Sequence, residues 1–230
     1  GLDRILVKGQ EGNDALTVNS TNGAIPLPIE YDGDGGNDFL TLTGGTATSD
    51  IYSVGPNPGQ GVSQITIGAV TQIVTFSNIE PVNDVVAGPL VINATPADNS
   101  INYSQGSSAT TGLVTVDNFE SIEFTNKTLL TLNAQAGSDT INLNNPSTPT
   151  SLTRIIVNGG DPTGREPNGG DSLASDRLVV NGTTLKDNIN YHPTGPDTGS
   201  VTGAGPIPID FNTTEGVTIN GQGGADSLTH

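Results

Sequence analysis

The chain has 230 residues, of which 24 are Asp or Glu and only 7 are Lys or Arg, so its formal net charge is −17 at pH 7. This charge repels phosphate and excludes a nucleic-acid-binding surface. The absence of Cys excludes disulfides, zinc–thiolate sites and a cysteine nucleophile. Apolar runs are only a few residues long, far short of the roughly 20 residues of a transmembrane helix. Short runs rich in Val, Ile, Leu and Thr instead indicate an all-β protein.

The first predicted strand, Ile5-Leu6-Val7, leads into a Gly-rich turn that ends at Asp14, and another strand follows at once. Near the C-terminus, Val217-Thr218-Ile219 leads in the same way into a turn that ends at Asp226. Both units follow the pattern acid-x-[IV]-x-[VI]-x-G-Q-x-G-x-D-x-L-T. Gly in such a turn supplies the positive φ that other residues adopt only at a cost. Related units end at Asp38 and Asp139, and a degraded copy with an insertion ends at Asp171.

A second kind of segment alternates with the first, and it places an Ile and a Tyr ahead of a Gly/Pro/Ser-rich turn and an apolar strand. Its three copies contain Tyr52, Tyr103 and Tyr191. Each copy leads to an acid, namely Glu80, Glu120 and Glu215. Because these residues recur with the repeat, we expect the tyrosines to pack in the core and the glutamates to serve the scaffold.

The motif positions also repeat over long distances. From Asp14 to a weak copy at Asp98 there are 84 residues, and from Asp139 to Asp226 there are 87. The spacing predicts one repeat-built β domain over residues 1–230, with modules at about 3–97, 98–138 and 139–230. One unit cannot bury its own apolar face, but stacked units form a continuous core. We therefore predict an all-β parallel β-helix, or β-solenoid, of irregular repeats, with tandem β-sandwich modules as the alternative.

The segments Gly33–Asp38 and Gly221–Asp226 resemble the G-G-x-G-x-D-x-U-x nonapeptide of hemolysin-type (RTX) proteins. In that family, tandem nonapeptides build a parallel β-roll and bind Ca²⁺ between neighbouring turns. Here each motif is separated from the next by strands. As a whole, the chain is similar to long repeat-rich β-solenoid proteins of environmental bacteria. This resemblance implies secretion and a structural or adhesive role.

Calcium is the cofactor that the acidic turns predict. Ca²⁺ takes about six to eight oxygen ligands, which an Asp and the carbonyls of a Gly turn can supply. The alternative is that each Asp caps its own turn by accepting hydrogen bonds from backbone N–H groups. The candidate metal ligands are Asp14, Asp32, Asp34, Asp38, Asp139, Asp171 and Asp226.

The sequence offers little for catalysis, because it has no Trp or Cys and only two histidines, His192 and His230. We expect a non-catalytic structural protein, extracellular or on a bacterial cell surface: a segment of an adhesin, matrix, sheath or self-assembling filament. The alternatives are a calcium-dependent binding or folding module of a secreted repeat protein and a carbohydrate-active β-helix. Because uncapped solenoid ends expose strand edges, the expected partners are copies of itself or neighbouring repeats, stacked end to end. Cell-surface polysaccharide is a further expected partner.

Overall fold

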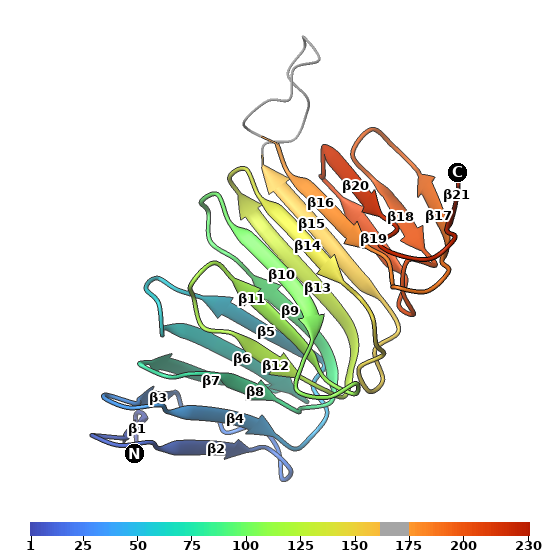
Figure 1. Ribbon diagram of the computed structural model, residues 1–230. Coiled ribbons are helices and arrows are strands. Elements are labelled where there is room, and N and C mark those ends of the chain that lie inside the picture. The colour runs from blue at the N-terminus through green and yellow to red at the C-terminus, as the bar shows by residue number, and fades with distance from the viewer. Residues whose placement is uncertain (162–174) are drawn as a thin grey trace.

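A computed structural model of the chain describes residues 1–161 and 175–230 (Figure 1). Within these residues the fold contains strands and no α-helix, so the prediction of an all-β chain is confirmed. The described part of the chain accordingly has no helix capable of crossing a bilayer. The strands are β1 (Ile5–Lys8), β2 (Ala15–Asn19), β3 (Ile29–Asp32), β4 (Phe39–Thr43), β5 (Ser49–Val54), β6 (Gly61–Ile67), β7 (Val70–Ser77), β8 (Val82–Asp84), β9 (Gly88–Asn93), β10 (Ser100–Gln105), β11 (Gly112–Val116), β12 (Ile122–Phe124), β13 (Lys127–Ala136), β14 (Thr140–Asn144), β15 (Ile155–Asp161), β16 (Arg177–Asn181), β17 (Asn188–Pro193), β18 (Gly199–Thr202), β19 (Ile209–Asn212), β20 (Gly216–Asn220) and β21 (Ser227–Thr229).

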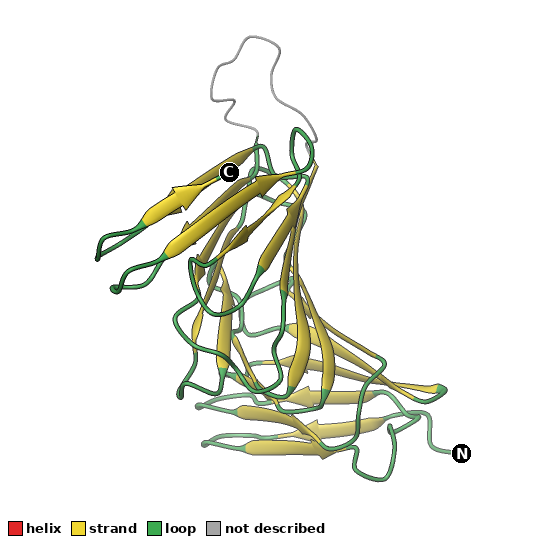
Figure 2. Ribbon diagram, turned by 90° about the vertical axis from the view of Figure 1, so that its right-hand side faces the viewer, coloured by secondary structure: helices red, strands yellow, loops and turns green. Residues whose placement is uncertain are grey.

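The strands form two sheets, and the chain passes repeatedly from one to the other (Figure 2). The twelve-stranded sheet has the order β1-β3-β7-β6-β5-β9-β13-β15-β19-β18-β17-β21, and the nine-stranded sheet has the order β2-β4-β8-β12-β11-β10-β14-β16-β20. Most neighbours are parallel, as expected when a strand of the other sheet separates them in the chain. Hydrogen bonding continues across the predicted module boundaries, since β13 pairs with both β9 and β15.

Three antiparallel meanders interrupt this parallel order. They are β5–β6–β7 and β17–β18–β19 in the twelve-stranded sheet and β10–β11–β12 in the nine-stranded sheet. Each begins at one of the predicted Ile/Tyr segments, and in each a Tyr of the first strand stacks on a Phe of the last. The ring centroids lie 5.9 Å apart for Tyr52–Phe76, 6.4 Å for Tyr103–Phe124 and 6.1 Å for Tyr191–Phe211. The expected packing role of the recurring tyrosines is confirmed.

The core lies between the two sheets. Buried and more exposed residues alternate along the strands, as in β11 and β14, because one face packs inward and the other meets solvent. Residues of equal position stack in register along a sheet, and one such column in the nine-stranded sheet contains Leu16, Leu40, Val82 and Ile122. Such columns make a thin but continuous core, which explains how a chain with 32% hydrophobic residues packs.

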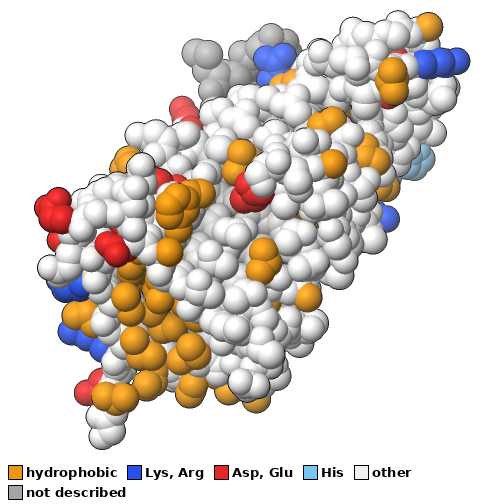
Figure 3. Space-filling model, turned by 60° about the horizontal axis from the view of Figure 1, so that its bottom comes forward, with side chains coloured by type: hydrophobic (Ala, Val, Ile, Leu, Met, Phe, Trp, Pro, Cys, Tyr) orange, Lys and Arg blue, Asp and Glu red, His pale blue; other side chains and the backbone are white. Residues whose placement is uncertain are grey.

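At each end of the paired sheets, the outermost strands have a neighbour on only one side among the residues that the structure describes. β1 and β2 form one end, and β21 and β20 form the other. At the first end, Leu2 and Leu6 are 77% and 51% exposed, and Figure 3 shows apolar side chains gathered there. At the other end, Leu185 and Leu228 are 74% and 61% exposed. Both ends therefore combine open strand edges with apolar surface.

Candidate functional site

The predicted Gly-rich motif forms the corner at which the chain leaves one sheet and enters the other. β1 passes to β2, and β3 to β4, through such corners. The second motif position has a positive φ even where it is not Gly, as in Gln10 at 78°. Gly36, at the third position, has a φ of 142°, and a Cβ on it would lie 1.6 Å from the carbonyl oxygen of Gly12 in the preceding corner. Gly36 is therefore needed both for its own conformation and for the close approach of two corners.

The first Gly of the motif makes room for the motif Asp. A Cβ on Gly33 would lie 2.6 Å from Oδ2 of Asp38, and one on Gly221 would lie 2.5 Å from Oδ2 of Asp226. Both distances are far below ordinary van der Waals contact. The five-residue spacing between Gly and Asp thus reflects a carboxylate packed directly against a bare Cα.

The motif aspartates form hydrogen bonds between successive corners, and we call this arrangement the carboxylate ladder. Oδ1 of Asp38 accepts a hydrogen bond of 2.7 Å from the backbone N–H of Asp14, and Oδ1 of Asp226 accepts one of 2.9 Å from Asp187. In each case the carboxylate bonds to the corner nearer the N-terminus, so the ladder has a direction. Three further bonds are Asn99 N to Asp139 Oδ1 at 2.7 Å, Asp139 N to Asp176 Oδ1 at 2.9 Å and Asp176 N to Glu215 Oε2 at 2.8 Å.

Four of the seven candidate calcium ligands belong to this ladder: Asp14, Asp38, Asp139 and Asp226. The carboxylates of Asp38, Asp139 and Asp226 accept hydrogen bonds from backbone N–H groups of the neighbouring corner, whereas Asp14 takes part through its own N–H. Asp32, at the end of β3, accepts hydrogen bonds from Ser77, Asn78 and the N–H of Asp34. Asp171 lies outside the described residues. Among the residues that the structure describes, no group of three or more His, Cys, Asp or Glu side chains is placed to hold a metal ion.

Calcium binding stays a prediction from the sequence, and melting curves test it. A turn held by Ca²⁺ loses its ion to EDTA, so the calcium prediction expects a lower Tm with the chelator and recovery when calcium is restored. An unchanged Tm in calcium, in EDTA and in magnesium would contradict it.

The weak motif copy lies one residue later than the sequence indicated. The register of β10 with β14 places Asn99, rather than Asp98, opposite Asp139. Asn99 donates its N–H to the ladder, whereas Asp98 accepts a hydrogen bond of 2.8 Å from the N–H of Ser138. Asp and Asn both suit turns, so composition alone did not distinguish the two neighbours.

Burial raises the pKa of two carboxyl groups of the carboxylate ladder, Asp139 and Asp176, and that of Glu120. The pKa of Asp139 rises to about 7 and that of Asp176 to about 6. Burial is the largest cause for both, hydrogen bonds from backbone N–H groups oppose it, and neighbouring carboxylates add to it. Burial and repulsion from Glu80 likewise raise the pKa of Glu120 to about 7. The folded chain therefore binds protons here more tightly than the unfolded chain does.

We expect the folded protein to lose stability as the pH rises from about 5 to about 8. Because the pKa values of these three carboxyls are raised in the folded state, their favourable contribution is complete below their unfolded pKa of about 4 and is lost as the pH passes through about 6 to 7. Allowing for solvent screening, the change amounts to about 2 kcal/mol. Urea denaturation at several pH values measures it. Asp139→Asn should flatten the dependence, and an unchanged slope would contradict the assignment.

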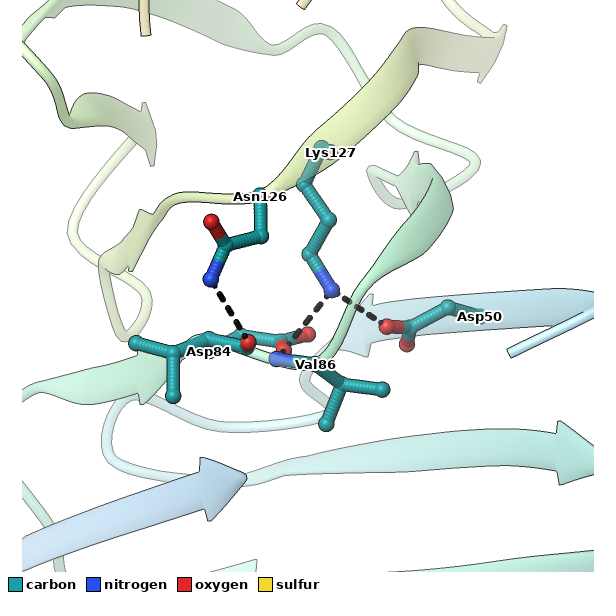
Figure 4. A network of polar contacts seen from close by, with 6 residues as sticks. Asp50, Asp84, Val86, Asn126 and Lys127 are labelled. Carbon is teal, nitrogen blue, oxygen red and sulfur yellow. Dashed lines mark hydrogen bonds and ion pairs between the residues drawn. The ribbon is translucent and has the colours of Figure 1, made fainter. Parts of the chain in front are cut away.

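A second polar cluster lies inside the molecule, and we call it the buried triad (Figure 4). Nζ of Lys127, at the start of β13, donates hydrogen bonds of 2.6 Å to Oδ2 of Asp50 in β5 and 2.8 Å to Oδ1 of Asp84 in β8. The exposed fractions of the three side chains are 0%, 0% and 1%. Asp84 Oδ1 also accepts a hydrogen bond of 2.9 Å from the N–H of Val86.

Sequence reasoning missed the buried triad. Lys127 stands at the start of an apolar run, where a lysine normally indicates a solvated strand end. Its partners Asp50 and Asp84 lie 77 and 43 residues away in the chain. Neither Asp50 nor Asp84 belongs to a sequence motif that also contains Lys127. The pairing of β13 with β9, and of β9 with β5, brings Lys127 to Asp50. Asp84 lies in the other sheet, where the pairing of β8 with β12 places it opposite Phe124, three residues before Lys127.

A carbohydrate-active site needs carboxyl groups in a groove, and one surface groove of this molecule contains carboxyl groups. The groove lies on the outer face of the twelve-stranded sheet, and its lining includes Glu30 and Asp32. Glu30 pairs with Arg4 at 3.1 Å. The hydrogen bond from Asn78 is the largest cause that lowers the pKa of Asp32. A general acid in glycoside hydrolysis needs a raised pKa, and the direction here is the opposite.

Comparison of the chain with protein-family models, with curated proteins and with solved structures finds no match. The features of this structure that bear on function are the carboxylate ladder and the open ends of the two sheets.

Proposed function

We propose that the chain is a non-catalytic extracellular structural protein: a β-solenoid segment of an adhesin, matrix, sheath or filament. Its two ends stack on further corners of the same kind, either in copies of itself or in neighbouring repeats. The two mostly parallel sheets, with residues of equal position stacked in register, support a solenoid. The single observation that carries the proposal is the unfilled first corner, residues 9–14.

The second corner packs on one side of the first corner, but no described residue packs on its other side, where Gly12 would receive a preceding corner. Elsewhere the third Gly of the motif packs against the corner before it: a Cβ on Gly137 would lie 2.7 Å from the carbonyl oxygen of Ala97, and one on Gly224 would lie 2.6 Å from that of Leu185. Gly12 has the same positive φ, 126°, with nothing within 4 Å of its Cβ position. The first corner is therefore shaped to receive another.

The backbone hydrogen-bonding groups of β1, at the same end of the sheets, also support stacking. Ile5 N–H bonds to Pro28 O and Gly9 N–H bonds to Asp32 O, both toward β3. Because alternate residues of a strand bond to opposite sides, the amides of Leu6 and Lys8 face the open edge. The N–H of Asp14 donates to the carboxylate of Asp38. Among the described residues, no backbone N–H donates in the same way to the carboxylate of Asp14.

The other end supplies the complementary groups. Gly216 N–H bonds inward to Asp176 O, so the amides of Val217 and Ile219 face outward. At this end, the third meander, β17–β18–β19, is only partly buried. Tyr52, in the first meander, is buried and donates a hydrogen bond of 2.8 Å to Glu120 O beside the nine-stranded sheet. Tyr191, at the equivalent position, is only partly buried. A further repeat placed over β17 would bury this ring.

Sedimentation velocity over a wide concentration range tests the proposal, with negative-stain images of the same samples. We expect linear oligomers whose mean size grows with concentration, because head-to-tail contacts of this kind do not close. Strictly monomeric protein at every concentration would contradict end-to-end stacking.

Gly12→Ala is the variant that tests the mechanism of stacking. The added methyl group would meet a carbonyl oxygen of the incoming corner, as the geometry of Gly36 shows, so oligomers should be lost while the monomer still folds. Gly68→Ala is the matched control, because Gly68 also has a positive φ and nothing within 4 Å but lies in the hairpin between β6 and β7. Equal loss of oligomers in both variants would point to strain rather than to the corner.

A further inference from the structure

The buried triad has no part in stacking, and its geometry brings a primary amine and two carboxyl groups together in a dry interior. Lys127 Nζ lies 2.6 Å from Oδ2 of Asp50 and 2.8 Å from Oδ1 of Asp84 (Figure 4). All three side chains are at least 99% buried. One cation and two anions would leave a net buried charge, which is costly, so one carboxyl group is expected to hold a proton.

The two carboxyl groups have different surroundings. Asp84 Oδ1 accepts hydrogen bonds from both Lys127 and the N–H of Val86, so two donors surround this oxygen. Oδ2 of Asp50 accepts from Lys127 alone, and the second oxygen of each carboxyl group, Asp50 Oδ1 and Asp84 Oδ2, is buried with no hydrogen-bond partner among the described residues. Burial, followed by repulsion from Asp84, raises the pKa of Asp50 well above its usual range, and Lys127 only partly opposes this. Asp50 is therefore the neutral acid and Asp84 the carboxylate.

We propose that Lys127 and Asp50 condense into an intramolecular isopeptide bond, with Asp84 as the general base. This modification goes beyond the proposed function and does not depend on it. Asp84 first takes a proton from the Lys127 ammonium group. The free amine then attacks Cγ of Asp50 and forms the new C–N bond. The C–O bond of the Asp50 hydroxyl breaks, and that oxygen leaves as water with its own proton and the second proton of the amine. One amide, one water and a neutral Asp84 result, and no oxidant or cofactor takes part.

Three physical features favour this step. The folded chain holds the amine in contact with the carboxyl group, which replaces an encounter in solution by a preorganised one. Asp84 Oδ1 lies 2.8 Å from Lys127 Nζ, so an acceptor for the proton of the ammonium group is already in place. The interior also excludes the water that would hydrolyse the amide.

The bond would join β5 to β13, which lie on either side of β9 in the twelve-stranded sheet. It would close a loop between residues 77 positions apart. Such a cross-link restricts the unfolded chain in the way that a disulfide does, in a sequence that has no Cys.

Intact-mass spectrometry of the purified full-length chain, denatured before measurement, tests the proposal. The expected mass is that of the sequence less one water, and fragmentation should yield a branched peptide that joins residue 50 to residue 127. A mass equal to that of the sequence, after incubation of the folded protein, would overturn the proposal and leave only a buried ion pair. This measurement on the wild-type chain decides the matter even if a variant fails to fold.

Three variants assign the roles. Lys127→Arg retains the charge but supplies no nucleophilic amine, so it should keep its full sequence mass. Asp84→Asn should keep its full mass as well, because the base is removed; loss of water in this variant would overturn the role of Asp84. Asp50→Asn should lose ammonia in place of water if the bond forms to residue 50. Loss of water from this variant would show that the bond forms to Asp84 instead.

Discussion

In protein whose mass shows no loss of water, Lys127→Met is expected to lower the free energy of unfolding by about 3–5 kcal/mol, because it leaves the buried carboxyl groups of Asp50 and Asp84 without their cation. Asp50 and Asp84 are both fully buried in the dry interior between the sheets. Without Lys127, one of them must be buried as an unpaired anion or take up a proton from solvent. Urea denaturation of the wild type and the variant measures the difference. The loss should be smaller at about pH 5 than at about pH 8, since protonation removes the buried charge.

A variant that replaces all three residues of the buried triad distinguishes the effect of an unpaired buried charge from the effect of lost packing. Lys127→Met combined with Asp50→Leu and Asp84→Asn has no buried charge, and it keeps an oxygen to accept the N–H of Val86. It should recover at least half of the stability that Lys127→Met loses, because well-packed neutral residues commonly replace buried ion pairs at little cost. A triple variant no more stable than the single one would show that lost packing, not an unpaired charge, causes the effect.

Gly36→Ala is expected to cost about 2–4 kcal/mol, because it adds overpacking to backbone strain. The new Cβ would lie 1.6 Å from Gly12 O and would force the first two corners apart. Separation of the corners would also strain the bond from Asp14 N–H to Asp38 Oδ1, which measures 2.7 Å. Thermal and urea denaturation of the variant measure the cost.

Gly12→Ala is the matched control for this experiment. Gly12 and Gly36 share a motif position and a positive φ, 126° and 142°, but only at Gly36 would a Cβ meet another corner. Measured on dilute monomer, Gly12→Ala should carry the conformational cost alone, about 1–3 kcal/mol. Equal losses in the two variants would mean that conformational strain, rather than the close approach of corners, explains the motif glycine.

Much of the local structure followed from the sequence. The alternating runs placed strands at Ile5–Val7 and Val217–Ile219, and these lie in β1 and β20. The Gly and Asp spacing predicted the corners, and the recurring Tyr predicted the packed start of each meander. These features depend on neighbouring residues, so a single sequence contains enough information to predict them.

The relation between the first and last motif copies was not predictable from their similarity. The corner that ends at Asp14 leads from the twelve-stranded sheet to the nine-stranded sheet, from β1 to β2. The corner that ends at Asp226 leads in the opposite sense, from β20 to β21. The same sequence pattern suits a corner that leads from the first sheet to the second and one that leads from the second to the first. In both cases alternate residues of each strand face the core, so the alternation does not show to which sheet a strand belongs.

The role of the motif aspartates was not predictable either. The same Gly and Asp spacing suits an ion-binding turn and a carboxylate that accepts an N–H from the next corner. The structure shows the second contact for Asp38 and Asp139. Which amide each one meets depends on the register of strands far apart in the chain, and a single sequence contains no signal for that register.

Hydrogen exchange at the open edge tests the central claim, end-to-end stacking, most directly. The amides of Leu6 and Lys8 face the edge of β1 that has no neighbouring strand, whereas Val7, like Ile5 and Gly9, bonds toward β3. We predict that exchange at Leu6 and Lys8 is fast in dilute protein and slows as the concentration rises. In Gly12→Ala the same amides should stay fast at every concentration. Equally fast exchange in concentrated wild-type protein would contradict stacking through this edge.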